Sequence, residues 1–413
     1  MSDPSKIYSP MQRFQYTYRS IDEFGGTPWA DSINYFVTGD INHDGQIEMI
    51  LSRGDVEQIA MDLTGRVLWH FLDPSANWQH RRPDSSVFIW DLDLDGKAEF
   101  VCTRRIDGQE HLCLIDAMTG DSRTATPLTK PTGECDNRGF VRLGLLDGPD
   151  QPGYVIAGWD YGRLAVYDCS LRLLWELDAP IGHDPFCYDL DGDGHEEIIC
   201  GYLAFDREGH LLWDSRHYLE HDSHADSFVF FQEQGEVRLF TSEGHILDAS
   251  GQLVDAIGQD ILIHGQEAGI ISTDQELRFV IQDSCDGVKQ TTYAFTRQGA
   301  VTFETSGAQN MQTVIWDGQG AGGIWLDTHG LIYDADGEAL AKVRAFEKGS
   351  WRTPTRGVGS AHDLMYDGRD ELIIRHFDED NRSAWCEIYA LDKLADRNEH
   401  KTTTRPMADW SFY

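Results

Sequence analysis

Three acidic nonapeptides, each set between two apolar runs, constrain the fold of this 413-residue chain more than any other feature. They read DINHDGQIE, DLDLDGKAE and DLDGDGHEE, and they begin at Asp40, Asp91 and Asp189. Each has an oxygen-bearing side chain at its first, third and fifth positions, a glycine at its sixth and a glutamate at its ninth. The flanking runs, such as YFVTG and MILS around the first copy, indicate β-strands. Each loop therefore connects two strands, not the two helices of an EF-hand.

Alternating side-chain oxygens ahead of a glycine turn can converge on one hard cation, so the three loops predict calcium (Ca2+) sites. The alternative is an ordinary polar turn, because Asp and Gly are also the usual turn residues. The predicted ligands are Asp40, Asn42, Asp44 and Glu48 in the first loop, Asp91, Asp93, Asp95 and Glu99 in the second, and Asp189, Asp191, Asp193 and Glu197 in the third.

A second motif, Asp-x-x-Gly between short apolar runs, recurs after the acidic loops and predicts a tight hairpin, as in MDLTGRVLW and FDREGHLLW. Together the two motifs define a unit of four short strands, A to D, that repeats about every 40 to 55 residues. The A-strands are expected to start near Ile33, Val87, Phe140, Phe186, Phe228, Gly269, Thr313 and Asp363. Repeats of this kind predict an all-β, eight-bladed β-propeller, with seven blades as the alternative.

The last unit lacks a fourth strand, because only a polar tail at 395–413 follows its third. Residues 10–18 can supply the missing strand and close the ring, so residues 1–413 are expected to form a single domain. The eight cysteines lie scattered, several of them in apolar runs, and are expected to be reduced core thiols.

The net charge of −36 excludes a nucleic-acid binder, which needs a basic surface. No apolar run has membrane-spanning length, so neither a membrane nor a nucleic acid is an expected partner, and a monomer is expected. The start, MSDPSKIYSPMQRF, lacks the regions of a secretory signal. The chain is expected to be either cytoplasmic or secreted after loss of its signal.

In an antiparallel A–B–C–D blade, the A–B and C–D turns share one face, here the bottom face. The B–C turns and D–A connections share the opposite, top face. The acidic loops thus fall on the bottom, and the top face collects Arg, His and Tyr. On so acidic a chain, an arc of arginines on one face indicates an anionic ligand, and Arg offers bidentate geometry for carboxylates. The predicted binding residues are Arg53, Arg81, Arg104, Arg138, Tyr161, His221, His224 and Arg375.

The acidic hairpins, together with following strands such as EFVCTR and EEIICGY, resemble those of β-propeller polysaccharide lyases. This group includes the rhamnogalacturonan lyases, the ulvan lyases and the L-rhamnose-α-1,4-D-glucuronate lyases. The hairpins also resemble calcium-binding repeats of integrin α-chain propellers. Five blades depart from the acidic pattern, for example FFQEQGEVRLF.

The lyase resemblance implies β-elimination at a rhamnosyl bond to O4 of a uronic acid in an anionic oligosaccharide or polysaccharide, giving an unsaturated uronate. Such chemistry needs a group that neutralises the carboxylate, a base for the C5 proton and an acid for the leaving oxygen. His80 or His183 is the expected base and Tyr202 the expected acid. Arg81, Arg104 or Arg138 would clamp the carboxylate.

Two other functions remain open from the sequence. The integrin-like hairpins favour a non-catalytic, calcium-binding adhesion or scaffold propeller. A glycoside hydrolase would instead need paired carboxylates on the top face, for which Asp160 and Asp184 are candidates.

Overall fold

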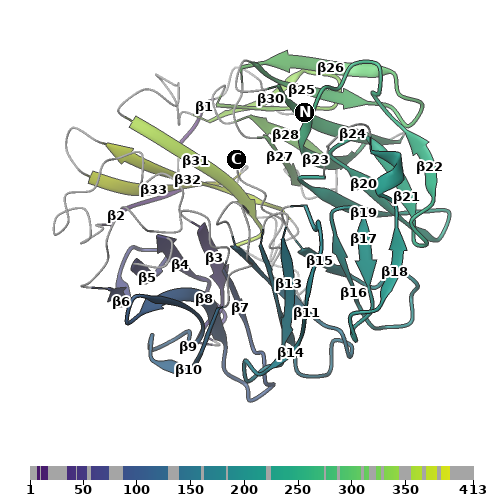
Figure 1. Ribbon diagram of the computed structural model, residues 1–413. Helices are drawn as coiled ribbons and strands as arrows, with labels where there is room; N and C mark the ends of the chain where they lie inside the picture. Colours follow the sequence, from purple (N-terminus) through teal and green to yellow (C-terminus); the bar gives the residue numbers. More distant parts are fainter. Residues whose placement is uncertain are drawn as a thin grey trace.

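The computed structural model describes residues 7–9, 11–16, 35–42, 44–53, 57–73, 87–128, 139–159, 162–182, 185–219, 225–273, 276–285, 289–307, 311–315, 322–326, 330–343, 355–364, 369–378 and 383–390. Within this part of the chain, eight sheets of mainly antiparallel strands are arranged around a ring (Figure 1). The expected eight-bladed β-propeller is therefore confirmed, and the seven-bladed alternative is wrong.

The strands of blades one to six follow one another in sequence, as expected for short antiparallel hairpins. Blades one to four comprise β3 (Tyr35–Gly39), β4 (Glu48–Arg53), β5 (Glu57–Asp62) and β6 (Val67–Leu72); β7 (Phe88–Trp90), β8 (Glu99–Ile106), β9 (Gln109–Asp116) and β10 (Ser122–Pro127); β11 (Gly139–Gly144), β12 (Tyr154–Trp159), β13 (Arg163–Tyr167) and β14 (Leu173–Asp178); and β15 (Pro185–Tyr188), β16 (Glu197–Cys200), β17 (Leu203–Phe205) and β18 (Leu211–Asp214). A short 3-10 helix, η3 (Arg216–Tyr218), follows β18.

Blades five to seven comprise β19 (Phe228–Glu233), β20 (Glu236–Thr241), β21 (His245–Asp248) and β22 (Leu253–Ala256); β23 (Gly265–Ser272), β24 (Leu277–Cys285), β25 (Lys289–Phe295) and β26 (Val301–Ser306); and β27 (Met311–Ile315), β28 (Gly322–Leu326), β29 (Leu331–Tyr333) and β30 (Ala339–Val343). Blade eight comprises β31 (Thr355–His362), β32 (Glu371–Asp378), β33 (Ser383–Tyr389) and, from the other end of the chain, β2 (Gln12–Tyr16).

The N-terminal strand β2 closes the ring, as the sequence predicted for residues 10–18. It pairs antiparallel with β33, and Gln12 lies opposite Ile388. Figure 1 shows the purple β2 beside the yellow β33, next to blade one. A second N-terminal strand, β1 (Ile7–Tyr8), adds a parallel fifth strand to blade seven. The predicted tail, 395–413, lies outside the described residues.

The sequence placed the start of one A-strand wrongly. It put the eighth A-strand at Asp363, but this strand is β31, which ends at His362. Asp363 instead opens the A–B loop of blade eight. The error arose because β31 carries Gly, Ser and Thr in place of the apolar run that marks most other A-strands.

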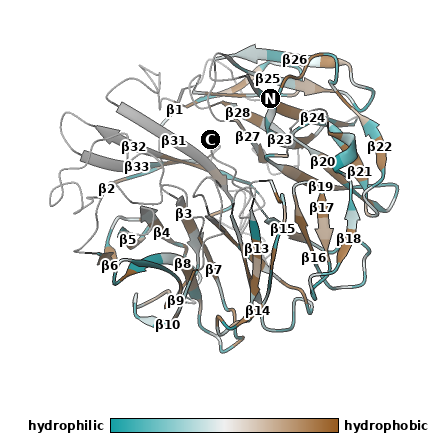
Figure 2. Cartoon of the chain, viewed as in Figure 1, coloured by the Kyte–Doolittle hydropathy of each residue, from teal (hydrophilic) through white to brown (hydrophobic). Residues whose placement is uncertain are grey.

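Eight apolar clusters hold the ring together, and each spans two neighbouring blades. The cluster between blades eight and one includes Phe14, Ile373, Met49 and Leu51. In Figure 2 the brown, apolar colour runs along middle strands such as β16 and β17. Burial of apolar surface drives folding, so the blades depend on one another for stability.

Tryptophans on the D-strands add polar contacts between blades. The indole N–H groups of Trp69, Trp175 and Trp213 donate to carbonyl oxygens of Ala117, Arg207 and Ala249, at 2.7, 2.7 and 3.1 Å. Each acceptor lies in the C–D turn of the following blade. The glycine of such a turn lies against the indole ring of the tryptophan: a Cβ on Gly251 would come within 2.6 Å of Trp213.

Candidate functional site

The three acidic loops on the bottom face share one backbone-capping pattern. The glutamate at position nine accepts a hydrogen bond from the backbone N–H of position two, at 3.0, 2.8 and 2.8 Å in the three loops. The aspartate at position one accepts from the glycine N–H at position six, at 2.9 Å in each loop. These bonds turn the alternating side chains toward one another, as the sequence predicted.

Two of these loops form groups that could hold a metal ion. Ligand oxygens of Asp91, Asp93 and Glu99 lie within 4.8 Å of one another, and so do those of Asp189, Asp191 and Glu197. Burial, together with the neighbouring aspartates, raises the pKa of Glu197 to about 7. Burial likewise raises the pKa of Glu99 to about 7.

The donor sets of the loops suit a hard cation. Oxygen ligands are those that Ca2+ prefers. In the second loop, Oδ1 of Asp91 is buried and has no hydrogen-bond partner among the described residues. In the first loop, burial raises the pKa of Glu48, and the amide nitrogen of Asn42 lies 3.1 Å from Glu48 Oε1. The second and third loops can thus offer several oxygens to one ion.

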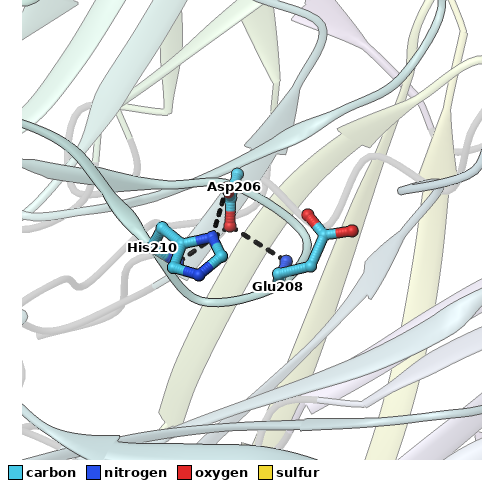
Figure 3. A group of neighbouring side chains, drawn as sticks. All are labelled: Asp206, Glu208 and His210. Carbon is cyan, nitrogen blue, oxygen red and sulfur yellow. Dashed lines mark hydrogen bonds and ion pairs between the residues drawn. The ribbon is translucent and has the colours of Figure 1, made fainter.

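A third compact group, Asp206, Glu208 and His210, is better explained as a turn (Figure 3). Asp206 Oδ1 accepts from the backbone N–H groups of Glu208 and His210, and its Oδ2 lies 2.9 Å from His210 Nδ1. In Figure 3 no dashed line reaches the Glu208 carboxylate. Arg66 pairs with Asp62 in the same way in blade one, so the group belongs to the Asp-x-x-Gly hairpin.

Blade eight contains a fourth, degenerate copy of the acidic loop that the sequence analysis missed. Asp363 occupies its first position and Glu371 its ninth, and Glu371 accepts from the backbone N–H of Leu364 at 2.8 Å. Its third position is Met365, which removes one oxygen ligand. The eight-residue spacing from Asp363 to Glu371, the same as in the three acidic loops, was the sequence signal for this fourth copy.

Carboxylates at position eight of two loops form hydrogen bonds to the preceding blade. The sequence analysis did not predict these contacts. Asp370 accepts from the backbone N–H of Ile315 at 2.6 Å, and Glu196 accepts from that of Leu145 at 2.7 Å. Both donors lie at the end of the preceding blade's A-strand. Burial raises the pKa of Asp370 to about 6.

On the top face, three backbone segments meet between blades four and five. A Cβ placed on Gly182 would lie 3.2 Å from the Cα of Gly201 and 3.2 Å from the carbonyl oxygen of Ala225. Gly182 precedes the A-strand of blade four, Gly201 lies in its B–C turn, and Ala225 precedes the A-strand of blade five.

Three predicted site residues are direct neighbours in the sequence of these three positions. His183 follows Gly182, Tyr202 follows Gly201, and His224 precedes Ala225. Of the three, only Tyr202 belongs to the described residues.

Tyr202 itself lies inside the junction of blades four and five. Its side chain is 1% exposed, and its hydroxyl lies 2.7 Å from His245 Nδ1 and 2.9 Å from Thr241 Oγ1. Burial raises the pKa of this phenol above its ordinary value. In this conformation the hydroxyl contacts protein groups on the top side of the blade.

A buried polar cluster continues along the top face from blade five to blade six. His264 lies 3.3 Å from Asp226 and 3.2 Å from Glu243, and these two carboxylates raise its pKa to about 10. Gln266 donates to Asp226 at 2.6 Å, and Asp283 accepts the backbone N–H of His264 at 2.7 Å. His264 is therefore an imidazolium at neutral pH.

Arg104 is a buried cation near the top of blade two. Its side chain is 5% exposed, its Nε donates to Gln58 at 2.7 Å, and its guanidinium lies 3.8 Å from the ring centre of Phe71. Its Nη2 is buried without a hydrogen-bond partner, and no carboxylate of the described residues pairs with it. The next residue, Arg105, is instead paired with Glu110.

Most other predicted top-face residues lie, wholly or by their side chains, outside the described part of the chain. For Arg53 and Arg375 the structure describes the backbone alone, in β4 and β32. Outside the described residues lie His80, Arg81, Arg138, Tyr161, His183, His221 and His224, and also Asp160 and Asp184. The described residues contain no helix that is both long and apolar enough to cross a membrane.

No family model matches the chain. Two curated relatives from Bacillus subtilis (strain 168) match part of it: rhamnogalacturonan exolyase YesX, 27% identical over 254 residues, and rhamnogalacturonan endolyase YesW, 26% identical over 259 residues. The matches cover 46% of this chain in both cases, and 41% of the exolyase and 42% of the endolyase. The chain thus spans about two-fifths of the length of these relatives.

Solved structures of similar architecture include rhamnogalacturonan lyase YesW, with a TM-score of 0.62 and 19% identity over 94% of this chain and 78% of that chain. A rhamnogalacturonan lyase of Bacillus licheniformis has a TM-score of 0.62 and 18% identity, covering 86% of this chain and 71% of that one. At such identity the likeness shows the fold. The expected resemblance to β-propeller polysaccharide lyases is confirmed, since the relatives and these neighbours are rhamnogalacturonan lyases.

Proposed function

We propose that the chain is a polysaccharide lyase that cleaves a rhamnosyl bond to O4 of a uronic acid by β-elimination. The names of the two curated relatives support this reaction class and favour galacturonate as the uronate. A rhamnose–glucuronate linkage is the second candidate. The adhesion and hydrolase alternatives have no relative among these matches to support them.

The proposed reaction removes the C5 proton of the uronate and breaks the C4–O4 bond. A C4–C5 double bond forms, and the leaving oxygen takes a proton from an acid, so no water is consumed. The carboxylate beside C5 must be neutralised for that proton to become acidic, which is why cationic side chains matter. A histidine near neutral pKa suits the base.

The observation that best supports a site on the top face is the meeting of Gly182, Gly201 and Ala225. His183 and His224 are neighbours in the sequence of two of these residues, and we propose that both imidazoles act on one substrate. His183 or His80 is the proposed base. Because Tyr202 is buried against His245, its proposed contribution to acid catalysis is to fix His245 at this junction.

Arg104 supports the proposed carboxylate clamp. A buried guanidinium normally has an anionic partner, and the described residues provide no carboxylate for this one. A uronate carboxylate has the right charge and bidentate geometry. We propose that Arg81 and Arg138 share this role, and that Arg53, Tyr161, His221, His224 and Arg375 contact the rest of the saccharide.

Calcium is the proposed ion of the acidic loops, on the face opposite the proposed site. When bound, it would neutralise the crowded carboxylates and cross-link each A–B hairpin. The side chains that would hold it are the loop residues named above. The chemistry on the top face is then left to protein side chains.

Single substitutions test the proposed roles. His80→Ala and His183→Ala are measured on rhamnogalacturonan by the ultraviolet absorbance of the unsaturated uronate, with His210→Ala on the bottom face as the control. At least one of the first two should lose about a hundredfold or more in kcat, the usual contribution of general base catalysis. Wild-type rates in both would refute the assigned base.

A further inference from the structure

The three blades with acidic loops differ at one matching position of the D-strand. Each of these blades has a β-bulge near the start of its D-strand. The bulge residue is Leu68 in blade one, Arg123 in blade two and Leu212 in blade four. The first and third loops thus have an apolar residue where the second has a cation.

Arg123 inserts its guanidinium among the carboxylates of the second loop. Its Nη1 contacts Glu99 Oε1 and lies 3.6 Å from Asp95 Oδ2 and 3.8 Å from Asp93 Oδ2. Its Nη2 lies 3.6 Å from Asp116 Oδ2 in the adjacent C–D turn. One side chain therefore reaches three of the four predicted ligands.

No equivalent cation faces the other two loops in the described part of the chain. In the third loop the carboxylates of Asp189, Asp191, Asp193 and Glu197 have no Lys, Arg or His partner there. In the first loop, the amide of Asn42 satisfies Glu48 Oε1 and Asp44 Oδ2, and Asn42 also removes one negative charge.

We propose that Arg123 acts as a built-in cation for the second loop, which therefore folds without a metal ion, whereas the third loop requires one. This inference rests on the proposed calcium sites and assigns them unequally. A guanidinium is held covalently and is always charged, so it offsets part of the loop's negative charge at any calcium concentration. Asp91 Oδ1, buried and without a hydrogen-bond partner among the described residues, marks the ligand position that Arg123 does not satisfy.

Exchange of the bulge residues tests the inference. Arg123→Leu gives blade two the residue of blades one and four, and Leu212→Arg gives blade four the residue of blade two. Leu174→Arg is the matched control, because Leu174 is the bulge residue of blade three, whose A–B loop is not acidic in this pattern. Bound calcium per full-length chain is measured by equilibrium dialysis and elemental analysis.

Arg123→Leu should bind one more calcium ion per chain than the wild type, Leu212→Arg one fewer, and Leu174→Arg the same number. Asp93→Asn in the wild-type background should leave the number unchanged, and this arm stands even if Arg123→Leu fails to fold. A loss of one ion in Asp93→Asn, or no gain in a folded Arg123→Leu, would overturn the inference.

The same measurements separate this inference from the proposed calcium sites. If the wild type binds no calcium while Arg123→Leu binds one ion, the role of Arg123 stands, but the metal requirement of the third loop fails together with the calcium site proposed there. If Leu212→Arg loses an ion but Arg123→Leu gains none, the third-loop site stands and the inference fails.

Discussion

Two adjacent arginines in β8 illustrate how single residues divide between structure and function. Arg104 is buried without a carboxylate among the described residues, whereas Arg105 is paired with Glu110 and also donates to the carbonyl of Gly108. A paired cation has its charge compensated by the protein. The charge of a buried cation without a carboxylate partner is not compensated by the protein, so an anionic ligand would stabilise it. Arg104 is therefore the stronger candidate for ligand contact.

Replacement of these two arginines should separate the roles. Arg104→Gln should raise KM for the saccharide by about 10- to 100-fold, because a charge-assisted contact is worth about 1.5–3 kcal/mol. Arg105→Gln should change KM little. Steady-state kinetics measure both, with thermal unfolding to confirm the fold. Equal KM values for wild type and Arg104→Gln would rule out Arg104 as a clamp.

His264 predicts a pH-dependent contribution to stability. Its pKa is raised by Asp226 and Glu243 to about 10, so the folded state holds the proton more tightly than the unfolded chain does. The stabilisation is complete below the unfolded pKa of about 6.5, decreases as pH rises, and is lost above the folded pKa of about 10.

Denaturant unfolding of wild type and His264→Gln at several pH values checks this expectation. The variant should be less stable by about 1–3 kcal/mol on the acidic side of that window, and the difference should shrink toward pH 10. His210→Gln, an exposed histidine with one carboxylate partner, is the control. A difference that does not vary with pH would contradict the ion-pair explanation.

Among the elements, the C–D turns show two reasons for glycine at one turn position, which Leu171 occupies in blade three with a φ of 61°. Gly251 and Gly299 both have positive φ, +76° and +81°. A Cβ on Gly251 would also lie 2.6 Å from Trp213 of the preceding blade, whereas a Cβ on Gly299 would meet nothing within 4 Å. A substitution at Gly299 therefore tests backbone strain alone, whereas one at Gly251 tests backbone strain and packing between blades together.

Alanine substitutions should distinguish these two costs. Gly299→Ala should destabilise by about 1–2 kcal/mol, the cost of a left-handed conformation. Gly251→Ala should cost about 1–3 kcal/mol more, because its methyl group must displace the indole ring. Chemical denaturation measures both. Equal losses would show that the contact with Trp213 is not important for stability.

The sequence predicted hairpins well because their determinants are local. Asp40, the loop glycines and Glu48 lie within nine residues, and their hydrogen bonds are those that the spacing implies. Contacts between blades could not be predicted in this way. The Trp69 indole and the Ala117 carbonyl are 48 residues apart, and Asp370 and Ile315 are 55 apart. No motif within one blade encodes such distant partners.

In the whole molecule, different kinds of side chain lie on the two faces of the propeller. The acidic loops and Asp-x-x-Gly turns lie on the bottom, while Tyr202, His264 and Arg104 lie at the top ends of their blades. This separation was predictable, because strand order alone determines which turns share a face. The roles of individual top-face residues were not, because Tyr202 occurs in a turn like many others and only its packing shows that it is buried.

The central proposal is that this propeller breaks the C4–O4 bond of a uronate whose O4 carries a rhamnosyl group, and product analysis of the full chain tests it most directly. Incubation with rhamnogalacturonan should give products with the ultraviolet absorbance of an unsaturated uronate, and mass spectrometry should show no water added. Saturated products carrying one added water, or unchanged polymer at any calcium concentration, would contradict the account.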